Sequence, residues 1–479
     1  MDRPVAWGSG FRGGRLLMEG AGLPFKSEEA EAYFSERAID LEPWPEPQAT
    51  VPEIADLFTE VLPRPGAVVL LALPSGTMLL RHLLGAVYGG AVPVPIPVGT
   101  PPARVRGLAH RFGASLLVTP RRRAGQDAGS RIVGGAQITP LRAPHAHHPS
   151  GGVIILTSGT SGIFSGCLHR SSSLLGNAAM HAASVGLGQA DTILVMLPLH
   201  FSYALVAQAL AGLVTGARLI ICGPPHTSAR FADAVRRHRV TSTSLTPFFM
   251  RRLIGGHEPE TLRMLTIGGD ALPATDVARL LELRPGRELY ITYGLTEAGP
   301  RVATLAAHAE PPHRYASVGR PMDGVKVALR KVRGQPDAVG ELLVSSDTVL
   351  VRKVGVPQGR PADCFAGPGT IATGDLFRID SDGYLYFAGR LTDPLVVDGV
   401  KVSLESVRSL AAAQPGVARA TISVRRDAPD EGYFDLELEM DDPTRESAHR
   451  VRDALYRRLL RAERPRRITV VPVREDVPK

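Results

Sequence analysis

Small hydroxyl residues and glycines gather directly after an apolar run that ends at Leu156. The segment reads Thr157, Ser158, Gly159, Thr160, Ser161, Gly162. Because these side chains are small, the backbone can approach an anion closely and offer N–H groups and hydroxyls to phosphate oxygens. A flexible Ser/Gly turn has the same composition, so the segment alone leaves both interpretations open. The chain contains no Gly-Lys pair, which excludes a Walker A loop.

Three further segments follow in a fixed order, and together with the first they resemble the adenylate-forming superfamily. This superfamily includes acyl-CoA synthetases, fatty-acyl-AMP ligases, adenylation domains of nonribosomal peptide synthetases and luciferases. The segments are YGLTE at 293–297, TGDL at 373–376 and DGYLYFAGR at 382–390. The family's TSGTTGxPKG matches residues 157–162 and Gly166, its GGExL matches residues 268–272 with Asp270 for Glu, and its GRxxD ends at Asp393. The resemblance covers roughly residues 50–479.

The resemblance implies a role for each matching residue, with ATP (yielding AMP) and Mg²⁺ as cofactors. It implies that Tyr293 stacks on adenine, where an aromatic face gains dispersion contact, and that Thr296 donates its hydroxyl to the α-phosphate. Glu297 would hold Mg²⁺, a hard ion that prefers oxygen ligands. Asp375 would accept hydrogen bonds from the ribose hydroxyls, and Arg390 would add a charged donor. The remaining nucleotide-binding residues are the 157–162 loop, Gly269, Asp270, Ala271 and Gly294.

His200 matches the His of the family's PLFHxxG segment, which in acyl and aryl ligases lies near the substrate carboxylate. A lone His beside apolar residues is otherwise a core histidine, and both interpretations are kept. The segment lacks the Asp with which amino-acid-activating domains pair a substrate ammonium, so a small acyl or aryl acid without an α-amino group is favoured. The predicted substrate pocket consists of His200, Phe201, Tyr203, Gly268 and Gly294.

Lysines that the family uses are missing. The chain has six lysines against 49 arginines. Ser165 stands where the phosphate loop has its Lys, and Val396 stands where the family has the Lys used in forming a thioester. The chain stops at Lys479, about five residues short of the family's catalytic Lys, so Lys479 is the predicted substitute. Removing one preorganised electrostatic group from a charged transition state costs about 10²–10³ in rate.

Two functions therefore remain open. In the first, the protein is an acid:AMP ligase that forms an acyl-adenylate and passes the acyl group to a phosphopantetheine thiol of CoA or of a carrier protein. A C-terminal lid would rotate about Asp393 between the two steps. In the second, it is a degenerate homologue that binds AMP or an acyl-adenylate, or catalyses acyl transfer only, without efficient adenylation. The motifs name neither the acid nor the acceptor.

Apolar runs that alternate with helical patterns must position these residues. Runs at 67–72, 115–119, 193–197 and 218–222 precede helical segments, which predicts a doubly wound, mostly parallel α/β sheet. Residues 120–150 are predicted to be a loop. After Asp393 the pattern changes to strands at 417–424, 434–440 and 468–473, with helices starting at 403 and spanning 445–461. We therefore expect a large domain over 1–392 and a small, mobile α+β lid over 393–479.

Composition limits the partners. The 479 residues carry a net charge of +8, but the arginines are scattered and no aromatic residues are interleaved with them, so we expect no nucleic-acid partner. The most apolar stretch, 66–98, carries Arg81 and His82 and is a poor membrane span, and no targeting signal is visible. Three cysteines without CxxC spacing fit neither a disulfide framework nor a typical zinc site, which favours a reducing cytoplasm. The oligomeric state is left open.

Overall fold

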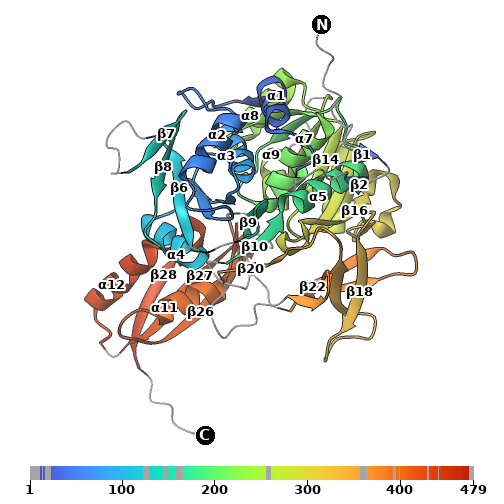
Figure 1. Cartoon of the computed structure of the whole chain (residues 1–479). Helices are drawn as coiled ribbons and strands as arrows, with labels where there is room; N and C mark the ends of the chain where they lie inside the picture. Colours follow the sequence, from blue (N-terminus) through green and yellow to red (C-terminus); the bar gives the residue numbers. More distant parts are fainter. Residues whose placement is uncertain are drawn as a thin grey trace.

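The structure is a computed structural model in which two large sheets and several smaller ones are arranged around helices (Figure 1). It describes residues 11–12, 15–16, 23–121, 129–143, 146, 148–157, 165–254, 260–355, 364–391, 395–398, 400–428, 431–440 and 442–473. The 158–162 part of the predicted phosphate loop, the predicted hinge Asp393 and Lys479 lie outside these residues.

The larger sheet has eight strands in the order β17-β16-β15-β14-β13-β11-β12-β3. Its strands are β3 (Ala38–Asp40), β11 (Thr192–Val195), β12 (Arg218–Ile221), β13 (Ser242–Leu245), β14 (Met264–Gly268), β15 (Glu288–Gly294), β16 (Arg301–Ala306) and β17 (Arg320–Pro321). The six strands from β3 to β15 are parallel, whereas β16 and β17 add antiparallel pairs at one edge. The sheet is therefore mixed, with its parallel part at the positions that the apolar runs predict.

The second sheet has the order β5-β4-β6-β8-β7. Its strands are β4 (Val68–Leu71), β5 (Val92–Pro95), β6 (Ala114–Pro120), β7 (Arg131–Val133) and β8 (Ala136–Pro140). The prediction of a loop over 120–150 is wrong for β7 and β8, which form a hairpin that continues antiparallel from β6. Each of these strands is too short and too polar to show an apolar pattern. They are strands because the edge of β6 supplies hydrogen-bond partners, and Gly134, at φ +52°, makes the turn.

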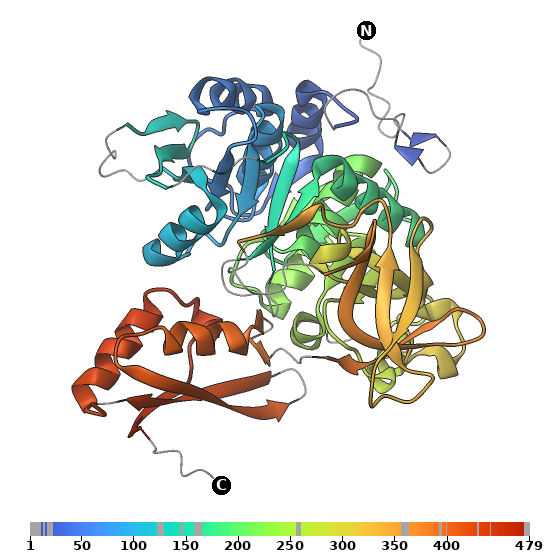
Figure 2. The same ribbon diagram turned by 60° about the horizontal axis from the view of Figure 1, so that its bottom comes forward.

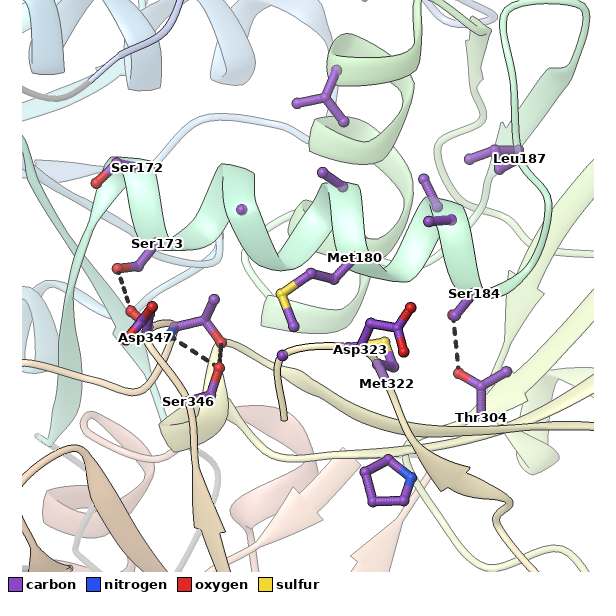
Figure 3. Close-up of a pocket in the computed structure, with 18 of the residues that line it drawn as sticks. Ser172, Ser173, Met180, Ser184, Leu187, Thr304, Met322, Asp323, Ser346 and Asp347 are labelled. Carbon is purple, nitrogen blue, oxygen red and sulfur yellow. Dashed lines mark hydrogen bonds between the residues drawn. The ribbon is translucent and has the colours of Figure 1, made fainter. Parts of the chain in front are cut away.

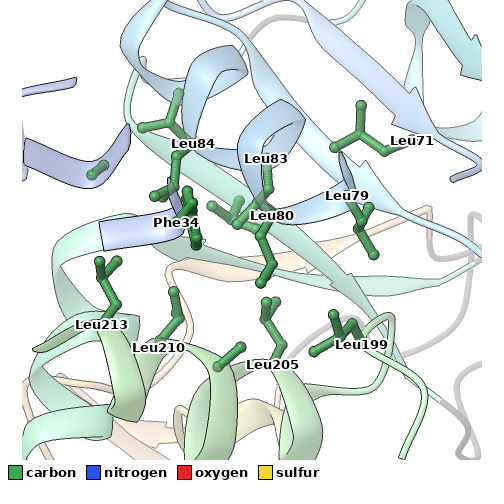
Figure 4. Close-up of a cluster of buried hydrophobic side chains, with 14 of the residues drawn as sticks. Phe34, Leu71, Leu79, Leu80, Leu83, Leu84, Leu199, Leu205, Leu210 and Leu213 are labelled. Atoms are coloured by element: carbon green, nitrogen blue, oxygen red, sulfur yellow. The ribbon is translucent and has the colours of Figure 1, made fainter. Parts of the chain in front are cut away.

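Helices fill the space between the two large sheets and form the largest apolar core (Figure 4). This layer contains α1 (Ser27–Arg37), α2 (Val51–Val61), α3 (Thr77–Tyr88), α5 (Ser171–Ser184), α6 (Ser202–Ala204), the π-helix η1 (Leu205–Leu210) and α7 (Ala211–Thr215). Leu80 and Leu83 of α3 face Leu205 and Leu210 of η1 in this core (Figure 4). At about 25 cal/mol per Å² of apolar surface, such a layer accounts for much of the folding energy.

Further helices cover the outer faces of both sheets, as a doubly wound arrangement requires. Apolar residues of α8 (Ser228–His238), α9 (Pro247–Leu253) and α10 (Ala274–Leu283) pack on the eight-stranded sheet, and those of α4 (Pro102–Phe112) pack on the five-stranded one. The short elements are β1 (Phe11–Arg12), β2 (Arg15–Leu16) and the 3-10 turns η2 (Thr296–Ala298), η3 (Ala307–Ala309) and η4 (Pro312–Arg314). No helix in the described part of the chain is both long and apolar enough to cross a membrane.

Two smaller sheets contain the remaining strands between residues 152 and 390. One contains β18 (Lys326–Lys331), β19 (Gly340–Ser345), β21 (Phe365–Gly367), β22 (Thr370–Ile379) and β23 (Leu385–Arg390). The other has the order β20-β10-β9, with β9 (Gly152–Leu156), β10 (Gly166–Arg170) and β20 (Arg352–Val354). Through β20, residues from the second half of the chain lie beside the strands that flank the 158–164 segment.

The C-terminal region is an α+β module with a hydrophobic core of its own (Figure 2). It contains β24 (Leu395–Val397), β25 (Val400–Val402), α11 (Leu404–Ala412), β26 (Val417–Ala428), β27 (Glu431–Met440), α12 (Arg445–Tyr456), η5 (Arg461–Glu463) and β28 (Arg467–Pro472). β27 pairs antiparallel with β26 and parallel with β28. The second predicted helix ends at Tyr456 rather than near 461, because the chain turns there and Arg464 lies over the Tyr456 ring.

Candidate active site

A cavity of about 310 Å³ lies where the parallel strands end, and it collects most of the motif residues that the structure describes. Strands of α/β sheets leave such a crevice at their carboxyl ends. The predicted site residues that line it are Thr157, Phe201, Tyr203, Gly269, Gly294, Thr296, Glu297, Asp375 and Arg390. A larger hollow of about 1130 Å³ lies along α5, beside Met180, Met322 and Asp323 (Figure 3). None of the predicted site residues lines that hollow, so the chemistry points to the smaller cavity.

Asp375 and Arg390 line one side of this cavity, and Tyr293 contacts Asp375 from behind it. Asp375 on β22 faces Arg390 on β23 across the ladder, and the Arg390 Nε lies 2.7 Å from Asp375 Oδ1. The hydroxyl of Tyr293, at the end of β15, donates to Asp375 Oδ2 at 2.7 Å. Burial, and then the neighbouring carboxylate, raise the pKa of Tyr293 well above its usual range. The carboxylate is thus fixed in place, 1% exposed, with two donors orienting it.

Tyr293 itself lies in a hydrophobic cluster, where its ring meets Phe377 edge to face with centroids 4.8 Å apart. It is not among the residues that line the cavity. The part played by its ring toward adenine therefore stays a prediction, whereas its hydroxyl has a role that the sequence does not reveal, as a donor to Asp375.

Thr296 and Glu297 lie on the short turn η2, directly after β15. The Thr296 hydroxyl and the Ser202 hydroxyl are 3.0 Å apart, so α6 contributes a second hydroxyl beside the motif. Glu297 forms an ion pair with Lys353 of β20. Burial disfavours the carboxylate, but the Lys353 ammonium outweighs that effect and lowers the pKa of Glu297 below its usual range. Both groups are therefore charged at neutral pH.

Lys353 was not predicted as a site residue, and it lies on the same face of the small sheet as Ser165. Lys353 pairs across the ladder with Cys167, and cross-strand partners project from one face. Ser165 precedes Cys167 by two residues, which places it on that face as well. The Lys353 side chain is only 8% exposed, and its Nζ reaches the Glu297 carboxylate. The only indication in the sequence was the scarcity of lysines: with six in the chain, each one was a candidate to supply the missing charge.

The two ends of the 158–164 segment are drawn together by Thr157 and Ser165. The Thr157 N–H donates to the Ser165 carbonyl at 3.2 Å, and their hydroxyls are 3.2 Å apart. Thr157 just after β9 and Ser165 just before β10 are therefore neighbours, and Thr157 lines the cavity together with Glu297.

His200, Gly268, Asp270 and Ala271 do not line the cavity in the part of the chain that is described. His200 is half-buried, and its ring lies 4.4 Å from that of Phe201, which does line it. Burial lowers the pKa of His200 to about 4, so the ring is neutral at pH 7. Asp270 is exposed and accepts a hydrogen bond from the Ala271 N–H at 2.9 Å.

The C-terminal module reaches the cavity through the hairpin of β24 and β25. Asp398 and Val400 line the cavity, and Val396 pairs with Lys401 within the hairpin. Elsewhere the module contacts the large part of the chain through an ion pair between Glu463 of η5 and Arg104 of α4. Both side chains are largely buried, so the pair contributes to holding the module against α4.

Three comparisons with known proteins agree with this geometry. Residues 46–351 match the family model described as AMP-binding enzyme. The chain is 28% identical to sulfoacetate–CoA ligase of Cupriavidus necator, covering 74% of each chain, and 29% identical to novobiocin biosynthesis protein H of Streptomyces niveus, covering 81% of this chain and 68% of that protein. Its fold matches o-succinylbenzoate CoA synthetase of Bacillus subtilis with a TM-score of 0.75 at 19% identity, over 93% and 95% of the two chains.

The matched residues span more than half of the chain, so it belongs to the AMP-binding enzyme family. The protein is thus a ligase of the adenylate-forming superfamily, which contains acyl-CoA ligases and the adenylation domains of peptide synthetases. The fold and the family prediction from the motifs are confirmed at this level.

Proposed function

We propose that the protein activates a carboxylic acid without an α-amino group and transfers it to a thiol. A carboxylate oxygen of the acid attacks the α-phosphorus of ATP in line, the bond to the β-phosphate oxygen breaks, and pyrophosphate leaves. The thiol sulfur then attacks the acyl carbon of the adenylate, loses its proton, and AMP departs. Positioning and charge stabilisation account for most of the catalysis in such phosphoryl chemistry.

The observation that carries this proposal is that the Asp375–Arg390 pair and Glu297 line one cavity, and that Lys353 of β20 pairs with Glu297. The oriented Asp375 carboxylate suits two ribose hydroxyls, because a carboxylate accepts several hydrogen bonds at once. The Lys353 ammonium pairs with Glu297, and Glu297 lines the cavity together with Thr157, which precedes the 158–164 segment where phosphates are expected. Together these groups are suited to hold a nucleotide by its sugar and by its phosphates.

Lys353 would take over the charge that the family's phosphate loop has lost at Ser165. Its ammonium comes from the neighbouring strand and from the same face, so it can meet the leaving pyrophosphate oxygens. Burial disfavours its charge, but Cys167 and Glu297 raise the pKa of Lys353 above its ordinary range, so it stays an ammonium through neutral pH. Lys353 would thereby replace the lysine of the phosphate loop, whose position Ser165 occupies.

Mg²⁺ fits Glu297 only together with phosphate oxygens. Mg²⁺ usually takes one or two carboxylates plus substrate phosphates and waters. Lys353 engages Glu297 Oε1, and the ionised carboxylate that it stabilises would hold the ion together with phosphate oxygens. The described residues contain no group of three or more acidic, His or Cys side chains that could hold a metal without a nucleotide. The related synthetase from B. subtilis has been solved with ATP and magnesium ion.

An amino-acid substrate is disfavoured by the charges that face the cavity. Among the described residues that line it, the carboxylates are Glu297, Asp375 and Asp398, and the first two are engaged by cations. The wall formed by Tyr203, Phe249 and Gly269 carries the guanidinium of Arg301 instead, which would repel a substrate ammonium. One relative, sulfoacetate–CoA ligase, is named for an acid of this kind.

A second function, nucleotide or acyl-adenylate binding without adenylation, is favoured by the same ion pair. Lys353 already engages Glu297, and Val396 replaces a family Lys in the hairpin that lines the cavity. Exchange of labelled pyrophosphate into ATP with a panel of small acids separates the two functions. We expect acid-dependent exchange and an acyl-adenylate in the mass spectrum. Tight ATP binding in calorimetry without exchange for any acid would establish the second function.

The acyl acceptor is tested after the adenylation step. The enzyme is incubated with the best acid, ATP and either CoA or a phosphopantetheinylated carrier protein, and the thioester is measured by mass. We expect one of the two thiols to release AMP at least tenfold faster than water does. Equal AMP release with and without thiol would show that the protein stops at the adenylate.

A further inference from the structure

Arg301 is a buried cation that lines the cavity, and no carboxylate of the described residues forms an ion pair with it. Its side chain belongs to a residue that is 2% exposed, yet the guanidinium has only one hydrogen bond among the described residues, from Nη1 to Thr292 Oγ1 at 3.3 Å. Its buried Nε has no acceptor there. The guanidinium carbon lies 4.5 Å from the centre of the Tyr203 ring. A guanidinium carries five N–H donors, so most of its capacity is unused.

The charge of this arginine is uncompensated as well. Burial lowers the pKa of Arg301, and only Tyr203 and Tyr293 act in the opposite direction. No carboxylate of the described residues contributes. Leaving a buried charge unpaired is costly, of the order of several kcal/mol. Proteins retain such a group where a ligand supplies the missing partner.

The surrounding backbone is built to hold the guanidinium at this place. A Cβ on Gly294 would lie 2.3 Å from Arg301 Nη2, and one on Gly268 would lie 3.3 Å from Nη1, so both glycines make room for it. Asn177 of α5 clamps the backbone of Arg301. Its Nδ2 donates to the Arg301 carbonyl at 2.9 Å, and its Oδ1 accepts from the Arg301 N–H at 2.8 Å. Asn177 is fully buried, so the clamp is protected from water.

We propose that Arg301 binds a second anionic group of the acid, so that the substrate is a short dicarboxylic or sulfocarboxylic acid. This inference rests on the proposed function. The groups proposed to hold the nucleotide lie on other elements, Asp375 on β22 and Lys353 on β20, whereas Arg301 projects from the eight-stranded sheet beside Tyr203. A carboxylate or sulfonate there meets the planar fork of the guanidinium, which favours two parallel hydrogen bonds.

The length of the acid is bounded by the cavity. Its volume of about 310 Å³ must also take the α-phosphate end of the nucleotide, which leaves space for a few carbons between the reacting carboxylate and the second anion. The Tyr203 and Phe249 rings provide the apolar walls for that short chain.

The test measures binding and turnover separately, with matched acids. Calorimetry on the full chain with saturating AMP compares succinate with butyrate, glutarate with pentanoate, and 3-sulfopropionate with propionate. We expect at least one dianionic acid to bind about 30-fold tighter than its monoanionic match, the lower end of what losing a buried charge pair costs. The variant Arg301→Met should lose this preference and leave the affinity for AMP and for the monoanionic acid within about threefold of wild type.

Two further variants serve as controls. Arg466→Met removes an exposed arginine that also lies over a tyrosine ring, that of Tyr433, on the C-terminal module. It should keep the full preference. Arg301→Lys keeps the charge but not the planar fork, so its preference should fall between those of wild type and Arg301→Met. If Arg301→Met does not fold, as judged by thermal unfolding, the lysine variant carries the test, and an unchanged preference in it overturns the inference.

The outcomes separate this inference from the proposed function. An equal preference in wild type and Arg301→Met, or a loss of AMP affinity that matches the loss of acid affinity, overturns the role of Arg301. Pyrophosphate exchange with dianionic acids that does not respond to Arg301→Met has the same meaning and leaves the ligase proposal standing. An Arg301-dependent affinity for a dianionic acid without any exchange refutes the ligase proposal and leaves the inference standing.

Discussion

Replacing Lys353 by Met tests whether this lysine supplies the charge that the phosphate loop lacks. The variant keeps the length of the side chain and removes the ammonium, which leaves the Glu297 carboxylate without its partner. Breaking a buried ion pair costs about 3–5 kcal/mol. Because the Glu297 side chain is 20% exposed, we expect a loss of stability near the lower end, about 3 kcal/mol, measured by chemical unfolding.

The effect on catalysis should be separate from the effect on stability. Loss of one preorganised cation at the leaving pyrophosphate should lower the exchange rate by about 10²–10³ at a temperature where the variant is folded. Lys331→Met is the matched control, since Lys331 forms an ion pair with Asp337 at 2.7 Å on the exposed surface. It should change the exchange rate and the stability little, because exposed pairs contribute about 0–1 kcal/mol.

A double variant tests whether the ammonium can be supplied from the loop position instead of from β20. Ser165→Lys combined with Lys353→Met restores a lysine on the same face, at the position where the family's loop has one. We expect it to recover at least tenfold of the lost exchange rate. An exchange rate of Lys353→Met within threefold of wild type, in folded protein, would refute the assignment of Lys353 to the phosphates.

Three further predictions concern the nucleotide, pH and the C-terminal module. Asp375→Asn should weaken AMP binding in calorimetry at least tenfold, because an amide offers one acceptor oxygen where the carboxylate offers two; unchanged affinity would contradict the site. Burial lowers the pKa of His82 and of His169 to about 4 and that of His181 to about 3. At a pH between these values and the usual pKa of 6.5, the histidines bind protons in the unfolded chain but not in the folded one. Stability should therefore fall as pH drops from 7 to 5, by about 1–2 kcal/mol per histidine, and His181→Asn should flatten the slope. Arg104→Glu should increase proteolysis of the C-terminal module, and adding Glu463→Arg should reverse it; no reversal would show that the pair does not hold the module.

The parallel strands of the large sheet were predictable because their signal is local. A strand buried on both faces reads as a short apolar run, as β4 and β11 do, and no other element has to be known to recognise it. The hairpin of β7 and β8 was missed because its stability comes from the edge of β6. Pairing with a distant strand cannot be recognised from the amino-acid composition of so short a segment.

The motif residues were predictable for a similar reason, since each motif is contiguous in the chain. The residues that bind these motif residues could not be predicted. The Tyr293 hydroxyl on Asp375, the Ser202 hydroxyl on Thr296 and the Lys353 ammonium on Glu297 each join residues at least 56 positions apart. Nothing in the local sequence of β20 distinguishes Lys353 from a solvated lysine.

The sequence by itself determined the family, the nucleotide motifs and the lack of lysines at family positions, because all of these are properties of short segments. Only the tertiary structure decided where charge is supplied and where it is left unpaired. Lys353 reaches Glu297 because β20 pairs with β10, and Arg301 is buried at the cavity because two glycines leave space for its guanidinium and Asn177 holds its backbone. Burial and pairing depend on segments that are distant in the chain, and these two properties decide whether a charged side chain is solvated or part of a site.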